Sequence, residues 1–448
     1  MSHYKPYPVY KDSGIEWIGE VPEGWKIISI KCLEGNSANV VQTGPFGAQL
    51  HADDYVDEGV PLILIRNVRD MRIDDTNIPQ VSLSDAERLS MYRLREGDIV
   101  FSRVGSIGRI ALCTERENGW LISGQMLRLR MTNLSVDKKF VAYAFESPSL
   151  LTFVELQSVG STRESINTEI LRNMPLPMPD IIEQREISAF LDRQTARIDA
   201  LITKKTRFIE LLKEKRQALI THAVTKGLDP KVKMKDSGID WIGEVPEHWK
   251  IAPLKTIADT ANGATPDSKN PAYWDGDIAW YTPADIDNTV IKPLSIPQRQ
   301  ITEAGLASCS AKLTPAGSIV ISTRAPVGSI GITTTISTTN QGCRSITPAP
   351  SMPSMLLASI FAAARSELAQ RSNGTTFQEL SSESLRALRI PLPPIDERLS
   401  IASALDRQTA RIDLIIEKTQ RSIDLLRERR SALITAAVTG KIDLRGSL

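Results

Sequence analysis

The chain repeats itself in the same order twice, and this repeat constrains its architecture more than any other feature. DSGIEWIGEVPEGWKI at residues 12–27 returns as DSGIDWIGEVPEHWKI at 236–251. A longer block at 190–229, which begins FLDRQTARID, returns at 404–443 as ALDRQTARID. Between these blocks the halves agree only in short stretches. The sequence therefore predicts a tandem duplication in which the repeated blocks have the same structural role twice. The segments between these blocks, called the divergent middles, should have different functions on a common scaffold.

The second shared block of each half has the spacing of a long helix. Apolar residues alternate at intervals of four and three, without an interrupting proline or glycine. The first copy has Ile187, Leu191, Ile198, Leu201, Phe208, Leu212 and Leu219, and the second has Ile401, Leu405, Ile412, Ile415, Leu426 and Leu433. This spacing is typical of a coiled-coil seam. Because a globular segment separates the copies, we predict an antiparallel pair related by a pseudo-two-fold. The alternative is two long helices buried in separate domains.

The divergent middles mix strand and helix patterns without βαβ regularity, which favours an α+β or mixed α/β fold. Strands are expected at 61–68, 98–104, 127–131, 277–281, 318–322 and 328–334, and helices at 84–92, 138–154 and 353–370. Ser84 is the expected N-cap of the first helix, with Glu87 completing a capping box. We predict four segments: a first reading domain at 1–180, a spacer helix at 181–226, a linker and second reading domain at 227–395, and a second spacer helix with tail at 396–448.

Composition and motifs argue against several functional classes. The four cysteines lie far apart without a CxxC pair, which favours a reducing, cytoplasmic compartment and no metal site. No apolar stretch is long enough for a membrane span. The sequence has no GxxxxGK[ST] phosphate loop, no GxGxxG fingerprint and no catalytic triad, so we expect no catalytic residues in this chain. NPAY at 270–273 resembles the NPPY loop of amino-methyltransferases, but the glycine-rich cofactor loop is missing and a loop turn is the better interpretation.

Four motifs, repeated in order, carry a resemblance that covers essentially the whole chain. They are WIGEVPEGW with WIGEVPEHW, TGPFGAQLHADDYVDEGVPLILIRNV with GATPDSKNPAYWDGDIAWYTPADI, PLPMPDIIEQREISAFLDRQTARIDALI, and RSALITAAVTGKIDLR. Together they resemble the specificity subunits of type I restriction–modification systems. The resemblance implies a non-catalytic subunit that binds double-stranded DNA, with each recognition domain reading one half of a split target and the helices setting the spacer. It also implies two methyltransferase subunits and restriction or translocase subunits as partners, with S-adenosylmethionine, ATP and Mg on those partners.

The charge distribution bears on this interpretation. The chain has 54 basic and 53 acidic residues, but residues 28–180 have a net charge of −4, residues 252–395 of +1 and residues 181–235 of +6. A DNA-binding domain that acts alone usually carries a basic stripe. Either the partner subunits supply most of the phosphate affinity, or the domains bind something other than DNA. The alternative functions are therefore a tandem-domain scaffold or adaptor and, less favoured, an enzyme with a concealed methyltransferase site.

Base recognition needs polar side chains on loops that reach a DNA groove. The candidates flank the strands that recur in both halves, or lie in the GSTR and GTT loops before the helices. They are Arg66, Asn67, Arg69, Arg103, Ser106, Arg109, Gln125, Arg128, Ser161, Thr162, Arg163, Thr282, Asp285, Arg324, Ser329, Gln341, Arg344, Thr375 and Thr376.

Overall fold

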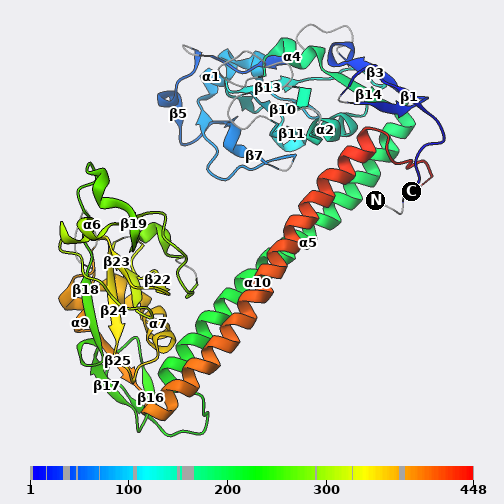
Figure 1. Cartoon of the computed structure of the whole chain (residues 1–448). Coiled ribbons are helices and arrows are strands. Elements are labelled where there is room, and N and C mark those ends of the chain that lie inside the picture. The colour runs from blue at the N-terminus through cyan, green and yellow to red at the C-terminus, as the bar shows by residue number, and fades with distance from the viewer. Residues whose placement is uncertain are drawn as a thin grey trace. The chain divides into compact units, whose positions relative to one another are not determined.

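A computed structural model describes residues 4–16, 18–33, 41–46, 49–69, 71–103, 108–148, 152–153, 166–287, 290–324, 326–372 and 379–446. The chain forms two compact units (Figure 1). Unit 1 comprises residues 1–205 with 421–448, and unit 2 comprises residues 206–420. Each long helix is divided between the two units, after Lys205 in the first helix and after Gln420 in the second. The boundaries predicted from the sequence instead gave each helix a segment of its own.

Unit 1 is built on an antiparallel sheet ordered β11 (Ile110–Leu112), β10 (Ile99–Ser102), β13 (Met126–Leu129) and β4 (Val41–Thr43). Helix α2 (Lys138–Glu146) packs its apolar face on this sheet, with the rings of Phe101 and Phe145 only 4.6 Å apart. A smaller sheet is ordered β12 (Leu121–Ile122), β6 (Val60–Ile63), β9 (Gln80–Val81) and β5 (Tyr55–Val56), with β12 and β6 parallel. The hairpin of β7 (Val68–Arg69) and β8 (Arg72–Ile73) and the helices α1 (Leu83–Arg88) and α4 (Thr168–Asn173) complete the recognition domain.

Unit 2 repeats this architecture with different side chains. Its larger sheet is ordered β18 (Ala258–Asn262), β24 (Cys343–Pro348), β21 (Ile319–Ser322) and β22 (Ile330–Ile332), and its smaller sheet β20 (Gln300–Ile301), β19 (Trp274–Tyr281) and β23 (Ser337–Thr339). Its helices are α6 (Glu303–Ala307), α7 (Ser354–Ala363), α8 (Arg365–Gln370) and α9 (Ser382–Arg386). The α+β class and the internal repeat predicted from the sequence are confirmed.

The shared sequence blocks form the same joints in both units. Hairpin β1 (Tyr10–Asp12) and β2 (Glu20–Pro22) corresponds to β15 (Met234–Asp236) and β16 (Glu244–Pro246). Strand β3 (Lys26–Ser29) pairs with β14 (Pro175–Met178), as β17 (Lys250–Pro253) pairs with β25 (Arg389–Leu392). The two ends of the chain meet in unit 1, where the Asp443 N–H donates to the Lys5 carbonyl at 2.8 Å.

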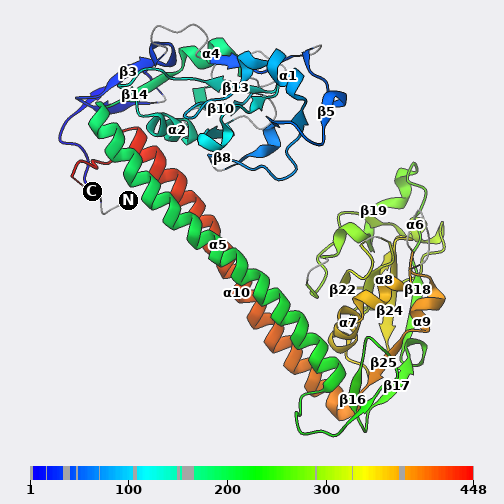
Figure 2. The same cartoon turned by 180° about the vertical axis from the view of Figure 1, so that it is seen from behind.

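Helices α5 (Ile181–Lys226) and α10 (Ile395–Val438) lie side by side in opposite directions within each unit (Figure 2). In unit 1 Arg430 pairs with Asp199 at 3.0 Å, and in unit 2 Arg216 pairs with Asp413 at 2.5 Å. The residue numbers of both pairs add up to 629, so α5 and α10 have the same register in unit 1 as in unit 2. These are the same two positions of the repeated block, and the predicted antiparallel pair is confirmed.

Several local predictions were wrong. The seam of α5 includes Ile209 and Ile220, whereas Leu201 and Phe208 are exposed. Ser82, not Ser84, is the N-cap of α1, because its hydroxyl accepts the Asp85 N–H at 3.1 Å. The helix predicted at 138–154 ends at Glu146, since Ser147 precedes a proline and takes an extended conformation. The helix predicted at 353–370 is divided at Ala364 into α7 and α8. None of the helices in the described ranges has an apolar stretch that could cross a bilayer.

Candidate nucleic-acid interface

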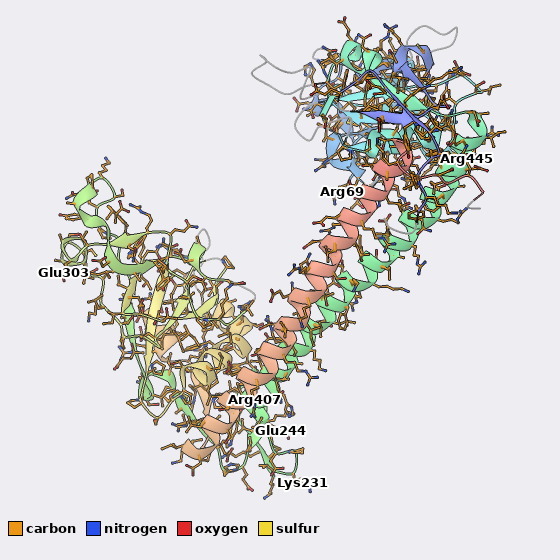
Figure 3. The ribbon with its side chains drawn as sticks, turned by 45° about the vertical axis from the view of Figure 1, so that its right-hand side comes forward. Arg69, Lys231, Glu244, Glu303, Arg407 and Arg445 are labelled. Atoms are coloured by element: carbon orange, nitrogen blue, oxygen red, sulfur yellow. The ribbon has the colours of Figure 1, made fainter. Side chains whose placement is uncertain are left out.

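Three predicted contacts lie just after β6, in a 3-10 turn (Ile65–Asn67) and the first strand of the β7–β8 hairpin. Asn67 is only 2% exposed. Its amide oxygen accepts the Leu64 N–H at 3.1 Å, and its amide nitrogen donates to the Asp74 carbonyl at 3.0 Å. Asn67 therefore ties the two ends of the hairpin together. Arg66 and Arg69 are exposed, and Figure 3 shows Arg69 on the surface of unit 1.

Unit 2 has the same turn after β19, at Pro283–Asp285. The Asp285 carboxylate accepts the backbone N–H and the hydroxyl of Thr282 at 2.8 and 2.7 Å, and its other oxygen accepts the Gln298 N–H at 3.1 Å. Thr282 and Asp285 thus perform the structural task of Leu64 and Asn67. Both side chains are partly buried.

A second group gathers in unit 1 where β10 ends and its antiparallel neighbour β13 begins. The Arg103 N–H donates to the Gln125 carbonyl at 2.9 Å, which brings these two predicted residues together. The Arg103 guanidinium lies over the ring of Phe46, 4.9 Å from its centroid. This cation–π contact holds the guanidinium against the face of an aromatic ring. Gln125 and Arg109 are exposed.

Arg128 lies in the interior of unit 1 and is only 3% exposed. Its guanidinium donates to the carbonyls of Met91 and Arg93 at 3.1 and 3.2 Å and to the side-chain oxygen of Gln42. Burial lowers the pKa of Arg128 to about 10, with a contribution from the like charge of Arg130. These contacts give Arg128 a structural role between the larger sheet and the segment after α1.

In unit 2 the corresponding groups are mostly engaged within the protein. The exposed guanidinium of Arg324 pairs with Glu379 at 3.2 Å. Arg344 donates to Asn262 and to the Leu380 carbonyl, and burial lowers its pKa. Ser329 is 3% exposed, and its hydroxyl donates to the Pro326 carbonyl at 3.4 Å. Gln341 is exposed and accepts a hydrogen bond from the Thr265 hydroxyl.

The structure shows that Arg103 corresponds to Thr323 and not to the candidate Arg324. The Arg103 N–H donates to the Gln125 carbonyl just before β13, and the Thr323 N–H donates to the Gly342 carbonyl just before β24, both at 2.9 Å. Six further candidates lie outside the described residues: Ser106, Ser161, Thr162, Arg163, Thr375 and Thr376. The candidate set as a whole stays a prediction, and its exposed members, chiefly Arg66, Arg69, Arg109 and Gln125, are those able to reach a ligand.

Two exposed arginines are not among the candidates predicted from the sequence. Arg72 lies opposite Arg69 on the β7–β8 hairpin. It could have been found, because it continues the three-residue spacing of Arg66 and Arg69. Arg299 lies over the indole of Trp274, 3.5 Å from its centroid. No sequence signal links these two residues, which come from different segments.

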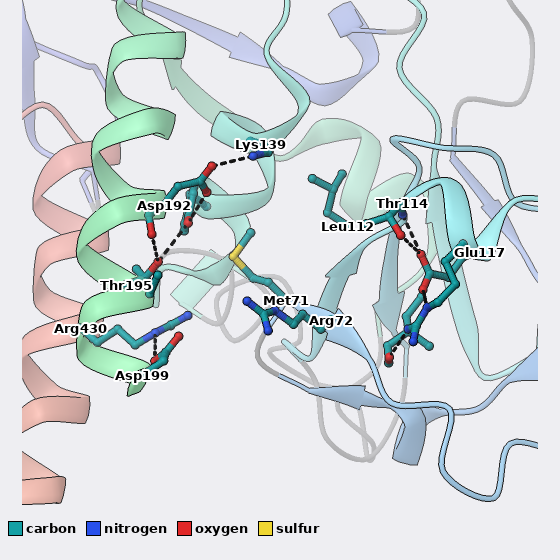
Figure 4. Close-up of a pocket in the computed structure, with 14 residues that line it drawn as sticks. Met71, Arg72, Leu112, Thr114, Glu117, Lys139, Asp192, Thr195, Asp199 and Arg430 are labelled. Carbon is teal, nitrogen blue, oxygen red and sulfur yellow. Dashed lines mark hydrogen bonds and ion pairs between the residues drawn. The ribbon is translucent and has the colours of Figure 1, made fainter. Parts of the chain in front are cut away.

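A cavity of about 570 Å³ lies between the recognition domain and the helices of unit 1 (Figure 4). On its helical side Asp192 accepts from Lys139 at 2.6 Å and from the Tyr143 hydroxyl at 2.8 Å, while Arg430 pairs with Asp199. On the opposite side lie Met71 and Arg72. No group of three or more potential metal ligands occurs within the described ranges. The cavity thus offers a charged surface and lacks the ligand set of a metal centre.

Comparison with known proteins identifies the same family for both halves. The family model described as the type I restriction modification DNA specificity domain matches residues 53–211 and again 246–423. The putative type I restriction enzyme MjaX specificity subunit of Methanocaldococcus jannaschii is 24% identical over 438 residues, covering 96% of each chain. The MjaIX specificity subunit of the same organism is 36% identical over 187 residues, covering 41% of this chain and 42% of the relative.

One solved structure has the same fold along nearly the whole chain. It comes from work on complex assembly and conformational transition of the type I R-M system. The likeness has a TM-score of 0.71 at 18% identity and covers 96% of this chain and 99% of the other.

Proposed function

This chain belongs to the family of type I restriction–modification DNA specificity domains, and on that premise we propose that its two recognition domains each read one half of a split DNA target. It is a specificity subunit, and catalysis in such systems lies on other subunits. The proposal concerns how this chain divides the recognition task. It is carried by one observation: the same scaffold occurs twice with different chemistry on equivalent loops.

That difference is clearest in the turns after β6 and β19. The side chains of Asn67, which is buried, and Asp285, which is partly buried, hold the same turn in both units. One residue before Asn67 and Asp285, unit 1 has Arg66 and unit 2 has Ala284, and both residues are exposed. A guanidinium donates hydrogen bonds to guanine, whereas an alanine methyl group can contact the methyl group of thymine. The half-targets should therefore differ in sequence, and the complete target should be asymmetric.

We further propose that α5 and α10 set the spacer between the half-targets and dock two modification subunits. The continuous length of the helices supports the first part: 46 residues of α5 correspond to about 69 Å at the usual rise. Exposed apolar side chains on both helices support the second. They are Leu201, Phe208 and Leu211 of α5 and Leu414 and Leu425 of α10. Repetition of the docking block predicts two copies of the partner.

We also propose that restriction or translocase subunits join this assembly, and that S-adenosylmethionine, ATP and Mg are bound by the partner subunits. The described residues of this chain supply hydrogen-bonding loops and helices instead. The proposed division of tasks predicts that the isolated chain binds DNA weakly, because its recognition domains carry little net positive charge.

The test is a methylation map of the source organism with and without this gene. We expect an asymmetric split motif that loses its methylation when the gene is deleted and regains it on complementation. A map that is unchanged by the deletion would refute the proposal. Exchange of residues 28–180 for the corresponding domain of a relative should change one half of the motif and leave the other half intact.

A further inference from the structure

We propose that Arg69 and Arg72, on the β7–β8 hairpin, together bind one phosphate of the DNA backbone beside the first half-target. The inference rests on the proposed function and deepens it, because it separates an anchoring contact from the contacts that read bases. Phosphate contacts fix the position of a protein on the duplex and carry no sequence information directly.

The strand pairing places the two guanidiniums on one face. Arg69 and Arg72 are directly opposite each other on antiparallel strands, as are Val68 and Ile73. Because neighbouring side chains of a strand point to opposite faces, each pair occupies its own face of the hairpin. Val68 and Ile73 are 0% and 5% exposed and belong to the core, whereas both arginines are exposed.

Like charges directly opposite each other destabilise a hairpin, so a bound anion would offset the repulsion between the two guanidiniums. Neither guanidinium has a hydrogen bond or ion pair with another described residue, although the charge of Arg69 contributes to lowering the pKa of Asp74. Arg72 also lines the cavity of Figure 4. The other basic residues there, Arg116, Lys139 and Arg430, are each paired with a carboxylate.

The hairpin is fastened at its base and beside its turn. Asn67 bonds to Leu64 and Asp74 at the base, and the Asp74 N–H donates to the Asn67 carbonyl at 2.7 Å. Near the turn, Met71 has a φ of 60° and its carbonyl accepts the Leu112 N–H at 3.3 Å from β11. A guanidinium pair on an anchored hairpin loses little backbone freedom on binding, which favours affinity. Arginine forks match the oxygens of a phosphate well.

The equivalent segment of unit 2 lacks these features. Counting from the equivalent residues Asn67 and Asp285, the positions of Arg69 and Arg72 are occupied in unit 2 by Asp287 and Val290. Asp287 pairs with Lys292 at 3.1 Å, so the segment has an internally balanced charge. The anchor is therefore specific to the first recognition domain, even though that domain is acidic as a whole.

The experiment uses the full chain assembled with its modification subunit, with two duplexes: one containing the mapped motif and one unrelated. The variants are R69Q, R72Q and the double variant, and the matched control is R95Q. Arg95 is exposed in the same domain, and its side chain has no hydrogen-bond or ion-pair partner among the described residues. Affinity is measured as a function of salt concentration, because one phosphate contact contributes about 0.9 to the slope of log K against log salt.

We expect the double variant to lower that slope by about 0.9 and to weaken binding of both duplexes by the same factor, with the methylation motif unchanged. Its melting temperature should be at least that of the wild type, since a repulsion is removed. A slope equal to that of R95Q would overturn the inference, as would a changed first half-motif, which would mean base reading instead. Wild-type complex that does not prefer the motif duplex would refute the proposed function itself.

Discussion

A heptad added to both long helices should lengthen the spacer of the DNA target without changing either half-target. The insertion must preserve the register of α5 against α10, which the pairs Asp199–Arg430 and Arg216–Asp413 define. Duplicating residues 201–207 in α5 and 415–421 in α10 adds the new heptads at matched positions. It also repeats the buried seam, because both helices have their inward-facing residues at intervals of four and three there.

The size of the effect follows from helix geometry. Seven residues extend each helix by about 10.5 Å, at about 1.5 Å per residue. One base pair occupies about 3.4 Å of the DNA axis, so the spacer should lengthen by about three base pairs. A heptad rotates a straight helix by only about 20° relative to its start, so each helix presents nearly the same face to its partner after the insertion.

The assay is methylation mapping in a strain whose own copy of the gene is replaced by the variant. Duplication in α5 alone serves as the control, because the register can then satisfy only one of the two ion pairs, and we expect loss of methylation. An unchanged spacer in the double-insertion strain would refute the ruler argument. A change in the bases of either half-motif would refute the assignment of base reading to the recognition domains.

Three further predictions concern single residues. R128A should destabilise unit 1 by about 3 kcal/mol, because the Met91 carbonyl and the Gln42 side chain lose their buried donor. R128M should lose less stability, because both variants remove the buried charge but methionine also fills most of the space of the arginine stem and leaves a smaller cavity. Urea unfolding gives the order of stability, and a stable variant with a changed motif would assign base reading to Arg128. G440A should lower the free energy of unfolding by about 1–2 kcal/mol because of the φ of +70°, and by about 1–3 kcal/mol more because the new Cβ would lie only 2.3 Å from Pro22. The equivalent variant G227A should cost less, because its Cβ would lie 3.2 Å from Trp249. Hydrogen exchange near residue 440 in G440A should therefore increase more than hydrogen exchange near residue 227 in G227A. Burial by itself would raise the pKa of Glu117, but hydrogen bonds from Thr114 and Arg116 outweigh burial and lower that pKa. The ionised Glu117 therefore stabilises the fold above the unfolded pKa of about 4.3, and this stabilisation is lost as the pH falls through the folded pKa. E117Q should flatten the acid side of a curve of stability against pH, and an unchanged curve would contradict the prediction.

The sequence was sufficient for the architecture because repetition and helical spacing are local patterns. The identical LDRQTARID blocks predicted paired helices, and Asp199 and Asp413 within those blocks make the equivalent ion pairs with Arg430 and Arg216. Strand positions were found to within a few residues, since β-rich runs are bounded by glycine and proline. Helix ends were less well predicted, because Ser82 and Ser84 are both good caps and only the hydrogen bond to Asp85 distinguishes them.

The candidate interface shows where sequence reasoning stops. Arginine, asparagine and glutamine were selected because their side chains can bind bases, yet the same groups also satisfy buried backbone atoms, as Asn67 and Arg128 do. Residue type does not separate these roles, since burial depends on segments distant in the sequence. By itself, the sequence determined the duplication, the helical pair and the family to which the chain belongs. Only the tertiary structure decided that Arg69 faces Arg72 across a hairpin while Arg128 is enclosed, because strand pairing and packing, not composition, decide which charges reach the surface.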